Sequence, residues 1–252
     1  MALPLFARVA LVTGAGVGIG RATAILLAQA GATVGVHYHT SKTGAEETAD
    51  AICQAGGQAI LLPGDLTLEA DANAVVDRFI EKTGRLDILF NNAGSPIKMT
   101  PIESCTLEQW RQVFDVNVTS AFLVTRRAIP HLRASKNGAI INNLSLSVQT
   151  GGAGGGGVYA AAKGALQVMT RTLAKELAPH VRVNAIMPGV VATAHHEIFS
   201  TPAKMEDYKR QTPLARNGVA DEVAQAVLFL ASDASSFMTG AILDINGGRF
   251  MR

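Results

Sequence analysis

The chain has 252 residues, of which 48% are hydrophobic and 17% charged, and its formal net charge is +2 at pH 7. These values suit one large α/β domain or two small ones with a sizeable core, and they exclude a disordered chain and a strongly basic nucleic-acid-binding protein. No apolar run reaches the roughly 18 residues of a membrane-spanning helix, so we expect no membrane partner. We also expect a cytoplasmic protein in which Cys53 and Cys105 stay reduced, because they lie far apart without metal-like neighbours.

The first predicted unit is a strand, a glycine-rich turn and a helix. Residues 8–13 form a short valine-rich run, which indicates a strand buried on both faces, and an amphipathic pattern predicts a helix over 21–30. Glycines allow the backbone to approach a pyrophosphate closely, and the helix N-terminus attracts its negative charge. We therefore predict a dinucleotide site, although the spacing T-G-x-x-x-G-x-G differs from the usual G-x-G-x-x-G. The residues expected to form it are Gly14, Val17, Gly18, Ile19 and Gly20.

The second strand, predicted over 32–38, should end beside the adenosine ribose of the dinucleotide. An NAD site places a carboxylate there to bind the ribose 2′-hydroxyl. Here the first acid after Gly31 is Glu46, and polar or basic side chains occupy the place instead. They can donate to a 2′-phosphate, so we predict NADP as the preferred cofactor and NAD as the alternative. Those side chains are His39, Thr40, Ser41 and Lys42, whereas Val17 stands where a basic residue would help.

Strands and helices keep alternating through the first half of the chain. Strands are predicted over 58–63 and 86–91, and helices over 45–54 and 69–82. Such alternation predicts a parallel, doubly wound sheet, whose ligands bind at the carboxyl ends of the strands. Residues at or just after those ends are therefore candidates for the cofactor site. They are Asp65, Leu66, Asn91, Ala93 and Gly94.

One long helical stretch is predicted over 106–132, with a kink near Pro130. Asn117 lies inside this stretch, between Val116 and Val118, so its side chain should be buried and should need hydrogen-bond partners. The pattern alone is compatible with a structural asparagine and equally with a catalytic one.

The predicted chemistry centres on a helix over 158–177, where Tyr159 and Lys163 stand four residues apart on one face. A phenol is a poor acid or base near neutral pH, because its ordinary pKa is about 10. A fixed ammonium one turn away favours the phenolate. We therefore expect Lys163 to lower the pKa of Tyr159 and to prepare it for proton transfer.

A strand predicted over 138–145 precedes that helix and carries Ser145 at its carboxyl end, with Ser147 as an alternative candidate close by. A run with six glycines in seven positions, 151–157, then follows. Because glycine loses much backbone entropy on folding, the run indicates a loop that is flexible or closely approached. The helix after it is apolar on more than one face, which indicates a subunit interface.

A sixth strand is predicted over 181–187, ending at Pro188 and Gly189. The segment 190–213 has no clear period, and a long irregular segment at the strand ends is typical of a substrate loop. Its adjacent His195 and His196 lack further ligands at suitable spacing, so we predict no metal site. A helix over 221–231 and a seventh strand over 241–246 complete the predicted elements.

In this order, the motifs resemble those of the short-chain dehydrogenase/reductase family across essentially the whole chain. The resemblance implies one domain over 1–252, an α/β Rossmann fold with a seven-stranded, doubly wound parallel sheet and helices on both faces. It also implies a homotetrameric, nicotinamide-dependent oxidoreductase that acts on a small-molecule carbonyl or alcohol. The matching residues are Thr13, Gly14, Gly18, Gly20, Asp65, Asn91, Asn92, Ala93, Gly94, Asn117, Ser145, Tyr159, Lys163, Pro188 and Gly189.

The same resemblance implies roles for single residues. Tyr159 would give the proton, Ser145 would bind the carbonyl oxygen, and Lys163 would hold the nicotinamide ribose. Asn117 would support a water-linked proton path to Lys163. Cofactor contacts would come from Asp65 at the adenine, from Asn91, Ala93 and Gly94 along the ribose, and from Val191 and Thr193 at the nicotinamide amide. Ser145 precedes Tyr159 by 14 residues, one more than the family pattern has, and the glycine run can absorb the difference.

Several functions remain compatible with these motifs. A 3-oxoacyl-thioester reductase would want a basic patch near the site entrance, which Lys204, Lys209, Arg210 and Arg216 could supply. A sugar or polyol dehydrogenase is the competing enzyme. A cofactor-sensing protein without catalysis should lack part of the Ser–Tyr–Lys set, and a methyltransferase would have no use for it.

Overall fold

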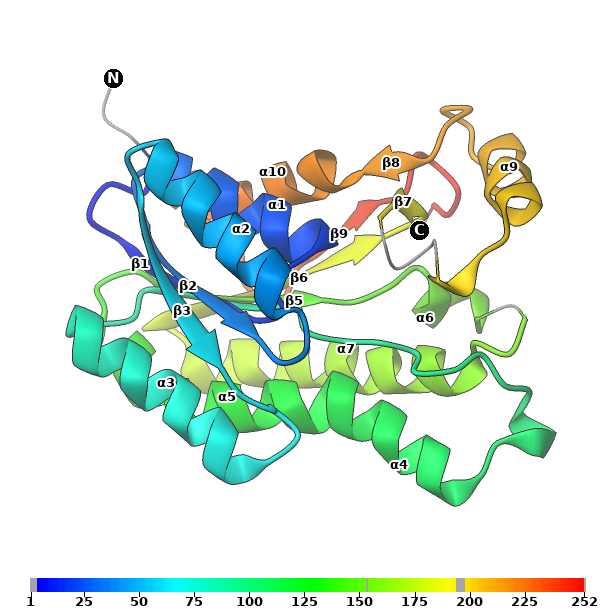
Figure 1. The fold of residues 1–252 in the computed structure, drawn as a ribbon, viewed down its shortest axis with the longest axis horizontal. Coiled ribbons are helices and arrows are strands. Elements are labelled where there is room, and N and C mark those ends of the chain that lie inside the picture. Colours follow the sequence, from blue (N-terminus) through cyan, green and yellow to red (C-terminus); the bar gives the residue numbers. More distant parts are fainter. Residues whose placement is uncertain (1–3, 153, 194–197, 252) are drawn as a thin grey trace.

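The computed structural model describes residues 4–152, 154–193 and 198–251. Its centre is one parallel sheet of seven strands in the order β3-β2-β1-β4-β5-β6-β9 (Figure 1). The strands are β1 (Val9–Val12), β2 (Thr33–Tyr38), β3 (Gln58–Pro63), β4 (Ile88–Asn91), β5 (Gly138–Asn143), β6 (Val181–Pro188) and β9 (Ile242–Ile245). The order reverses between β1 and β4, so the sheet is doubly wound, as predicted.

Helices cover both faces of the sheet (Figure 1). One layer, above the sheet in this view, contains α1 (Gly18–Gln29), α2 (Lys42–Gln54) and α10 (Ala220–Ala231). The other contains α3 (Glu69–Thr83), α4 (Leu107–Phe114), α5 (Ser120–Ala134) and α7 (Gly157–Leu177). Helix α1 packs against α2 and α10, and α3 packs against α5. The predicted fold class is therefore confirmed.

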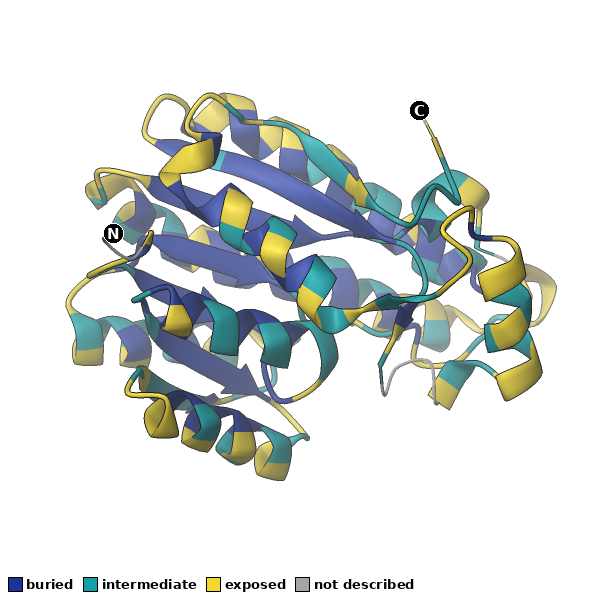
Figure 2. Ribbon diagram, turned by 90° about the horizontal axis from the view of Figure 1, so that it is seen from above, coloured by how far each residue is buried: buried dark blue, intermediate teal, exposed yellow. Residues whose placement is uncertain are grey.

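The core consists of two main layers, one on each face of the sheet. Adjacent residues of a strand point to opposite faces, so Val12 packs toward α1 and α10 while Leu11 packs toward α3 and α5. This is why the strands read as continuous apolar runs rather than as alternating ones. Figure 2 shows the central strands buried along most of their length, whereas the helices alternate buried and exposed turns.

The long helical stretch predicted over 106–132 is interrupted in the structure. Between α4 and α5, the residues Asp115–Thr119 form a π-helical turn that contains Asn117. Asn117 Nδ2 donates to the carbonyl of Val113, 2.8 Å away, which is the acceptor that an α-helix reserves for the backbone N–H of residue 117. The side chain therefore competes with the backbone, and the helix widens there. Pro130 lies inside α5, which continues to Ala134.

The segment 190–213 contains more regular structure than its sequence pattern predicted. Val191–Ala192 form a strand, β7, that pairs with β8 (Gly218–Val219), and Pro202–Arg210 form helix α9. The start of α9 has a signal that the pattern analysis passed over, because Thr201 is its N-cap and proline follows. The predicted fifth strand also ends earlier, at Asn143, and Ser147–Thr150 form the short helix α6.

Candidate active site

A cavity of about 660 Å³ opens at the carboxyl ends of the strands. Figure 1 shows α6, α9, β7 and the C-terminus of the chain gathered at this end of the sheet. Most of the residues predicted for the site meet on its wall. Those that line it are Gly14, Val17, Gly18, Ile19, His39, Ala93, Gly94, Ser145, Tyr159, Lys163, Pro188, Gly189, Val191 and Thr193.

The glycine-rich turn forms one end of the cavity. Gly14 and Gly18 have φ angles of 63° and 55°, in the left-handed region that favours glycine. A Cβ on Gly20 would lie 2.2 Å from the carbonyl oxygen of Gly14, so α1 packs directly under the turn. No side chain caps α1, which begins at Gly18, so its first N–H groups can serve an anion. The predicted phosphate cradle thus has the geometry that a pyrophosphate requires.

A buried histidine that the sequence analysis did not single out fixes this turn. His37, the fifth residue of β2, is 2% exposed. Its Nδ1 accepts a hydrogen bond from the N–H of Gly14, at 3.1 Å. Its Nε2 lies 3.1 Å from the carbonyl oxygen of Gly64, to which it donates in the neutral tautomer that this arrangement requires. The pKa of His37 is lowered to about 4, mainly by burial; the hydrogen bond with Gly64 and the charge of Asp65 act in the opposite direction, and the nearby His39 acts in the same direction as burial.

This histidine predicts a pH dependence of stability. The folded-state pKa of about 4 lies below the ordinary 6.5, so between these values the unfolded chain binds more protons at this residue. The contribution of His37 to the free energy of unfolding is complete above about pH 6.5. It should fall by on the order of 3 kcal/mol as the pH drops to about 4. Urea unfolding measures the free energy of unfolding of the wild type and of His37→Asn across this pH range. The two plots of this free energy against pH should converge at low pH. Parallel plots would contradict the lowered pKa of His37.

Tyr159, Ser145 and Lys163 meet at the cavity wall. The first turn of α7 carries Tyr159, and Lys163 follows one turn later, with its Nζ 5.7 Å from the centre of the Tyr159 ring. The side chain of Lys163 is 2% exposed, and its Nζ donates to the carbonyl oxygen of Asn143 at 2.8 Å. Ser145, just beyond the end of β5, hydrogen-bonds with the phenol. The structure therefore brings these three predicted side chains together.

Burial determines the pKa values of this pair. It raises the pKa of Tyr159 to about 12, while the hydrogen bond with Ser145 acts in the opposite direction. Burial also lowers the pKa of Lys163 to about 7. The expectation that Lys163 lowers the pKa of Tyr159 is therefore wrong for this structure. Both charged forms lose hydration in the same wall, and this loss is the largest cause of both shifts.

The geometry distinguishes the two candidate serines. The hydroxyl of Ser145 contacts Tyr159, whereas Ser147 starts α6 and its backbone N–H donates to Ser145 Oγ at 3.2 Å. Ser145 is therefore the serine that faces the phenol.

Backbone atoms of neighbouring segments lie close to the glycine run 151–157. A Cβ on Gly152 would lie 2.4 Å from the carbonyl oxygen of Gly156, and one on Gly155 would lie 2.7 Å from the N atom of Thr100. This packing explains why glycines occupy the extra length between serine and tyrosine.

Asn117 lies behind the cavity wall rather than on it. Its Nδ2 donates to the carbonyl oxygens of Ser95 and Val113 at 2.7 and 2.8 Å. Its Oδ1 is buried and has no hydrogen-bond partner among the described residues. A Cβ on Gly94 would lie 2.6 Å from this Oδ1 and 2.9 Å from Lys163 Nζ, so both atoms border the space that the missing side chain leaves. An unpaired acceptor close to a buried amine is a suitable place for an ordered water.

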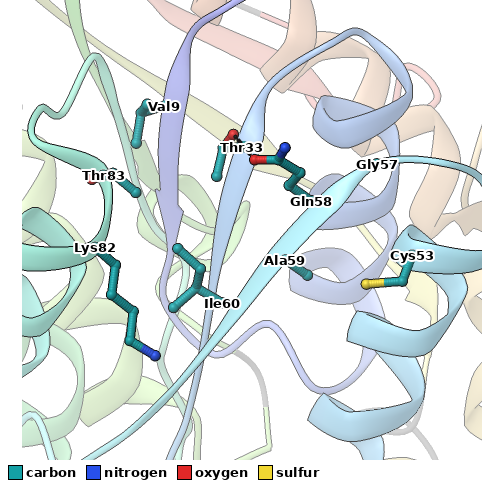
Figure 3. Close-up of a pocket in the computed structure, with 9 residues that line it drawn as sticks. All are labelled: Val9, Thr33, Cys53, Gly57, Gln58, Ala59, Ile60, Lys82 and Thr83. Carbon is teal, nitrogen blue, oxygen red and sulfur yellow. Dashed lines mark hydrogen bonds between the residues drawn. The ribbon is translucent and has the colours of Figure 1, made fainter.

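A second pocket, shown in Figure 3, lies at the opposite end of the sheet. It is lined by residues at the starts of β1, β2 and β3, including Val9, Thr33 and Gln58. Thr33 Oγ1 donates to Gln58 Oε1 at 3.1 Å, and Cys53 and Lys82 come from the flanking helices. This pocket brings together no acid, base and oxygen-binding group, so the carboxyl-end cavity is the candidate active site.

Known proteins match the chain along almost its full length. A family profile described as enoyl-(acyl carrier protein) reductase matches residues 14–249. The uncharacterized oxidoreductase YgfF of Escherichia coli (strain K12) is 39% identical over 246 residues, covering 96% of this chain and 99% of that protein. A 3-oxoacyl-[acyl-carrier-protein] reductase of Synechocystis sp. is 38% identical over 249 residues, or 98% of each chain. The solved structure of a 7α-hydroxysteroid dehydrogenase, complexed with NADH and 7-oxo glycochenodeoxycholic acid, superposes with a TM-score of 0.93 at 34% identity, covering 98% of this chain and 96% of that one.

The chain belongs to the short-chain dehydrogenase/reductase family. It is an NAD(P)-dependent oxidoreductase, and it transfers hydride between a nicotinamide and a carbonyl or alcohol group. Its cavity fits such a cofactor in two respects: the uncapped N-terminus of α1 can bind the pyrophosphate, and the missing Cβ at Gly94 leaves room beside Lys163.

Six residues predicted for the site of this short-chain dehydrogenase/reductase do not line the cavity: Gly20, Lys42, Asp65, Leu66, Asn91 and Asn117. Asn91 is a core residue, because its Nδ2 donates to Thr125 Oγ1 and Asn142 Oδ1, both at 2.9 Å. Leu66 is buried in the core beside α3.

Two charged residues among these six have other partners. The Lys42 ammonium lies 3.7 Å from Glu46 one turn along α2, and its side chain is 70% exposed. The carboxylate of Asp65 accepts hydrogen bonds from the N–H and hydroxyl of Thr67, at 3.0 and 2.8 Å. Strand ends alone could not show which polar groups face the ligand and which close a local turn.

The remaining site predictions concern metals and membranes. Among the described residues, no three His, Cys, Asp or Glu side chains come together as metal ligands, and His195 and His196 lie outside those residues. Within residues 4–152, 154–193 and 198–251, none of the helices combines the length and hydropathy needed to span a bilayer.

Proposed function

We propose that this oxidoreductase reduces a small-molecule carbonyl compound and that Tyr159 is its general acid. The observation that carries the proposal is the Ser145–Tyr159–Lys163 group on the cavity wall, in which the pKa of Tyr159 is raised to about 12. At neutral pH the phenol is therefore protonated and can donate to a carbonyl oxygen. A cofactor sensor without catalysis would not need this group.

Each residue of the group has a role that follows from its contacts. When bound, the nicotinamide cofactor supplies the hydride. Ser145 hydrogen-bonds the carbonyl oxygen and orients it toward Tyr159, which gives up its proton as negative charge develops on that oxygen. Lys163, whose ammonium is held by the carbonyl of Asn143, would hold the nicotinamide ribose, as the family resemblance implies. The unpaired Oδ1 of Asn117, near Lys163, can hold a water that returns a proton toward the site.

NADP is the cofactor that the adenosine end of the cavity favours. His39, Thr40 and Ser41 line it, and they can donate to a 2′-phosphate, whereas Lys42 pairs with Glu46. Asp65 acts in the opposite direction, because its carboxylate lies 4.0 Å from His39 Nε2 and would repel a 2′-phosphate. NAD stays the alternative, because the solved steroid dehydrogenase is a complex with NADH.

A fluorescence titration with NADPH and NADH in parallel tests this cofactor preference. We expect NADPH to bind about tenfold tighter than NADH, as one or two charge-assisted hydrogen bonds would give. In His39→Asp the carboxylate should repel the 2′-phosphate, so the preference should shrink or reverse, while Lys42→Gln should behave as the wild type. Tighter binding of NADH by the wild type would overturn the NADP proposal.

The substrate should be recognised by the segment 190–213, which supplies Val190, Ile198, Phe199, Lys204 and Tyr208 to the cavity wall. We infer that it closes the substrate end of the site. The name of the relative from Synechocystis supports a 3-oxoacyl-thioester as one candidate substrate, and a sugar or polyol is the other. However, three of the four cations considered for a carrier-protein patch are paired with acids on the surface, Lys209 with Glu206, Arg210 with Asp207 and Arg216 with Glu222.

We also propose that the protein is a cytoplasmic homotetramer, as the family resemblance implies. The support in the structure is a set of large apolar side chains exposed on α4, α5 and α7: Leu107, Trp110, Phe122 and Val168. The extra apolar face predicted for α7 is mostly used within the chain, since Leu166, Leu173 and Leu177 are buried there. Light scattering on the purified protein gives the number of subunits directly.

A further inference from the structure

Two cations, Lys204 and Arg249, lie at the substrate end of the cavity. Both line its wall and are only partly exposed. They contact the same aromatic ring, because the Arg249 guanidinium carbon is 4.5 Å from the centre of the Tyr208 ring and Lys204 Nζ is 5.7 Å from it. Arg249 also donates from Nη2 to Gln211 Oε1 at 2.8 Å. The two residues are far apart in the sequence, and only the fold brings them to the same ring.

The local structure holds both side chains in place. Helix α9 is fixed at its start by Thr201, whose hydroxyl accepts from the N–H of Lys204 at 3.2 Å. Near the C-terminus, Asn246 Oδ1 accepts from the N–H of Gly248, and the Asn246 carbonyl accepts from the N–H of Arg249 at 3.2 Å. Figure 1 shows α9 and the end of the chain on the same side of the sheet as α6. The two cations are therefore built into the wall rather than carried on a loose tail.

The pair differs from the other cations of this region. Lys209, on the exposed side of α9, lies 2.7 Å from Glu206, and Arg210 lies 3.5 Å from Asp207. In the part of the chain that the structure describes, no carboxylate pairs with Lys204 or Arg249. A positive charge that is partly buried without a neighbouring anion has an unfavourable desolvation free energy. A bound anion would offset this cost.

We propose that Lys204 and Arg249 form an anion subsite, and that the substrate is a carbonyl compound with a terminal anionic oxygen group, carboxylate or phosphate. This inference rests on the proposed reduction of a carbonyl at Tyr159, to which it adds the substrate class. The planar guanidinium, oriented by Tyr208 and Gln211, can bind two anionic oxygens at once, and the ammonium adds a point charge beside it. The apolar side chains of Val190 and Phe199 on the same wall suit the carbon chain between the two ends.

The test compares matched substrates of different charge. Oxo acids of increasing chain length, their methyl esters and the corresponding oxo-alkyl phosphates are offered with NADPH to the wild type, Lys204→Gln and Arg249→Gln. Lys209→Gln is the matched control, because this lysine lies on the same helix but is paired with Glu206 outside the cavity. We expect the wild type to prefer an anionic substrate to its ester, mainly through KM. The preference should fall by about tenfold in each cavity variant and should persist in the control.

The possible outcomes distinguish a failure of the anion subsite from a failure of the proposed carbonyl reduction. Reduction of oxo compounds without any preference for the anionic members overturns the subsite and leaves the proposed function standing. A preference that survives in Lys204→Gln and Arg249→Gln also overturns it. The arms with carboxylate and phosphate show which anion the subsite takes.

A binding measurement covers the case in which none of these compounds is reduced. Calorimetry with the oxidised cofactor present, where hydride cannot be transferred, should show an oxo acid or oxo-alkyl phosphate binding at least about tenfold tighter than the ester, and the difference should disappear in the two variants. Equal affinity for the charged and neutral compounds would overturn the inference.

Discussion

Replacing Tyr159 by Phe should lower kcat at least about a hundredfold, because the carbonyl oxygen then loses its proton donor. The change removes one hydroxyl and leaves the ring in its place beside Lys163, so the affinity for the cofactor should stay close to that of the wild type. Stopped-flow or steady-state rates, combined with a fluorescence titration of NADPH, measure both quantities on the same preparation. Near-normal turnover in this variant would rule out the general-acid role.

Tyr38→Phe is a matched control for this prediction. Tyr38 ends β2, is buried and does not line the cavity, so removing its hydroxyl should leave kcat within about twofold of the wild type. A comparable loss in both variants would indicate that the rate depends on general stability rather than on the phenol of Tyr159. The raised pKa of Tyr159 adds a further expectation. Because the phenol stays protonated well above neutral pH, the enzyme should still have its proton donor for reduction at these pH values.

Adding one methyl group at Gly20 should remove cofactor binding almost completely. The Cβ of Gly20→Ala would lie 2.2 Å from the Gly14 carbonyl oxygen and 2.5 Å from Asn92 Nδ2, so the turn above α1 must shift. Asn92 Nδ2 donates to the carbonyl oxygens of Thr13 and Gly14, at 2.9 and 3.0 Å, and these bonds would be strained or lost. We expect at least about a hundredfold weaker NADPH binding, and about 1–3 kcal/mol less stability from overpacking.

Gly164→Ala makes the same change in a helix with room for it. The nearest atom to a Cβ at Gly164 is Val148 Cγ1, at 4.0 Å, and alanine is the better helix former by about 1 kcal/mol. This control should bind NADPH as the wild type does and should be equally or more stable by thermal unfolding. Normal cofactor affinity in Gly20→Ala would show that the turn can adapt, and would contradict the close packing as the reason for glycine.

The chain's pattern of apolar runs and glycines predicted the sheet correctly because both depend on local rules. A strand such as Val9–Val12, buried on both faces, is apolar throughout, and a turn whose φ angles are positive favours glycine, as at Gly14 and Gly18. The three residues that the family motifs indicate for catalysis, Tyr159, Lys163 and Ser145, line the same cavity. The stretch predicted as helical over 106–132 is helical from Leu107 to Ala134, but its π-helical turn was not predicted, since propensity alone does not show that the side chain of Asn117 competes with its own backbone.

The sequence by itself therefore determined the order of strands and helices and the glycine turn, and it indicated the residue types that we propose for the reaction centre. Only the tertiary structure decided the rest, because burial and long-range contacts set it. It made His37 the support of the turn and turned Asn91 into a core residue. It raised the pKa of Tyr159 instead of lowering it. It also brought Arg249 and Lys204 to the same ring, that of Tyr208, although no spacing in the sequence connects them. Spacing describes neighbours along one element, whereas electrostatics depends on everything that surrounds a group in the folded chain.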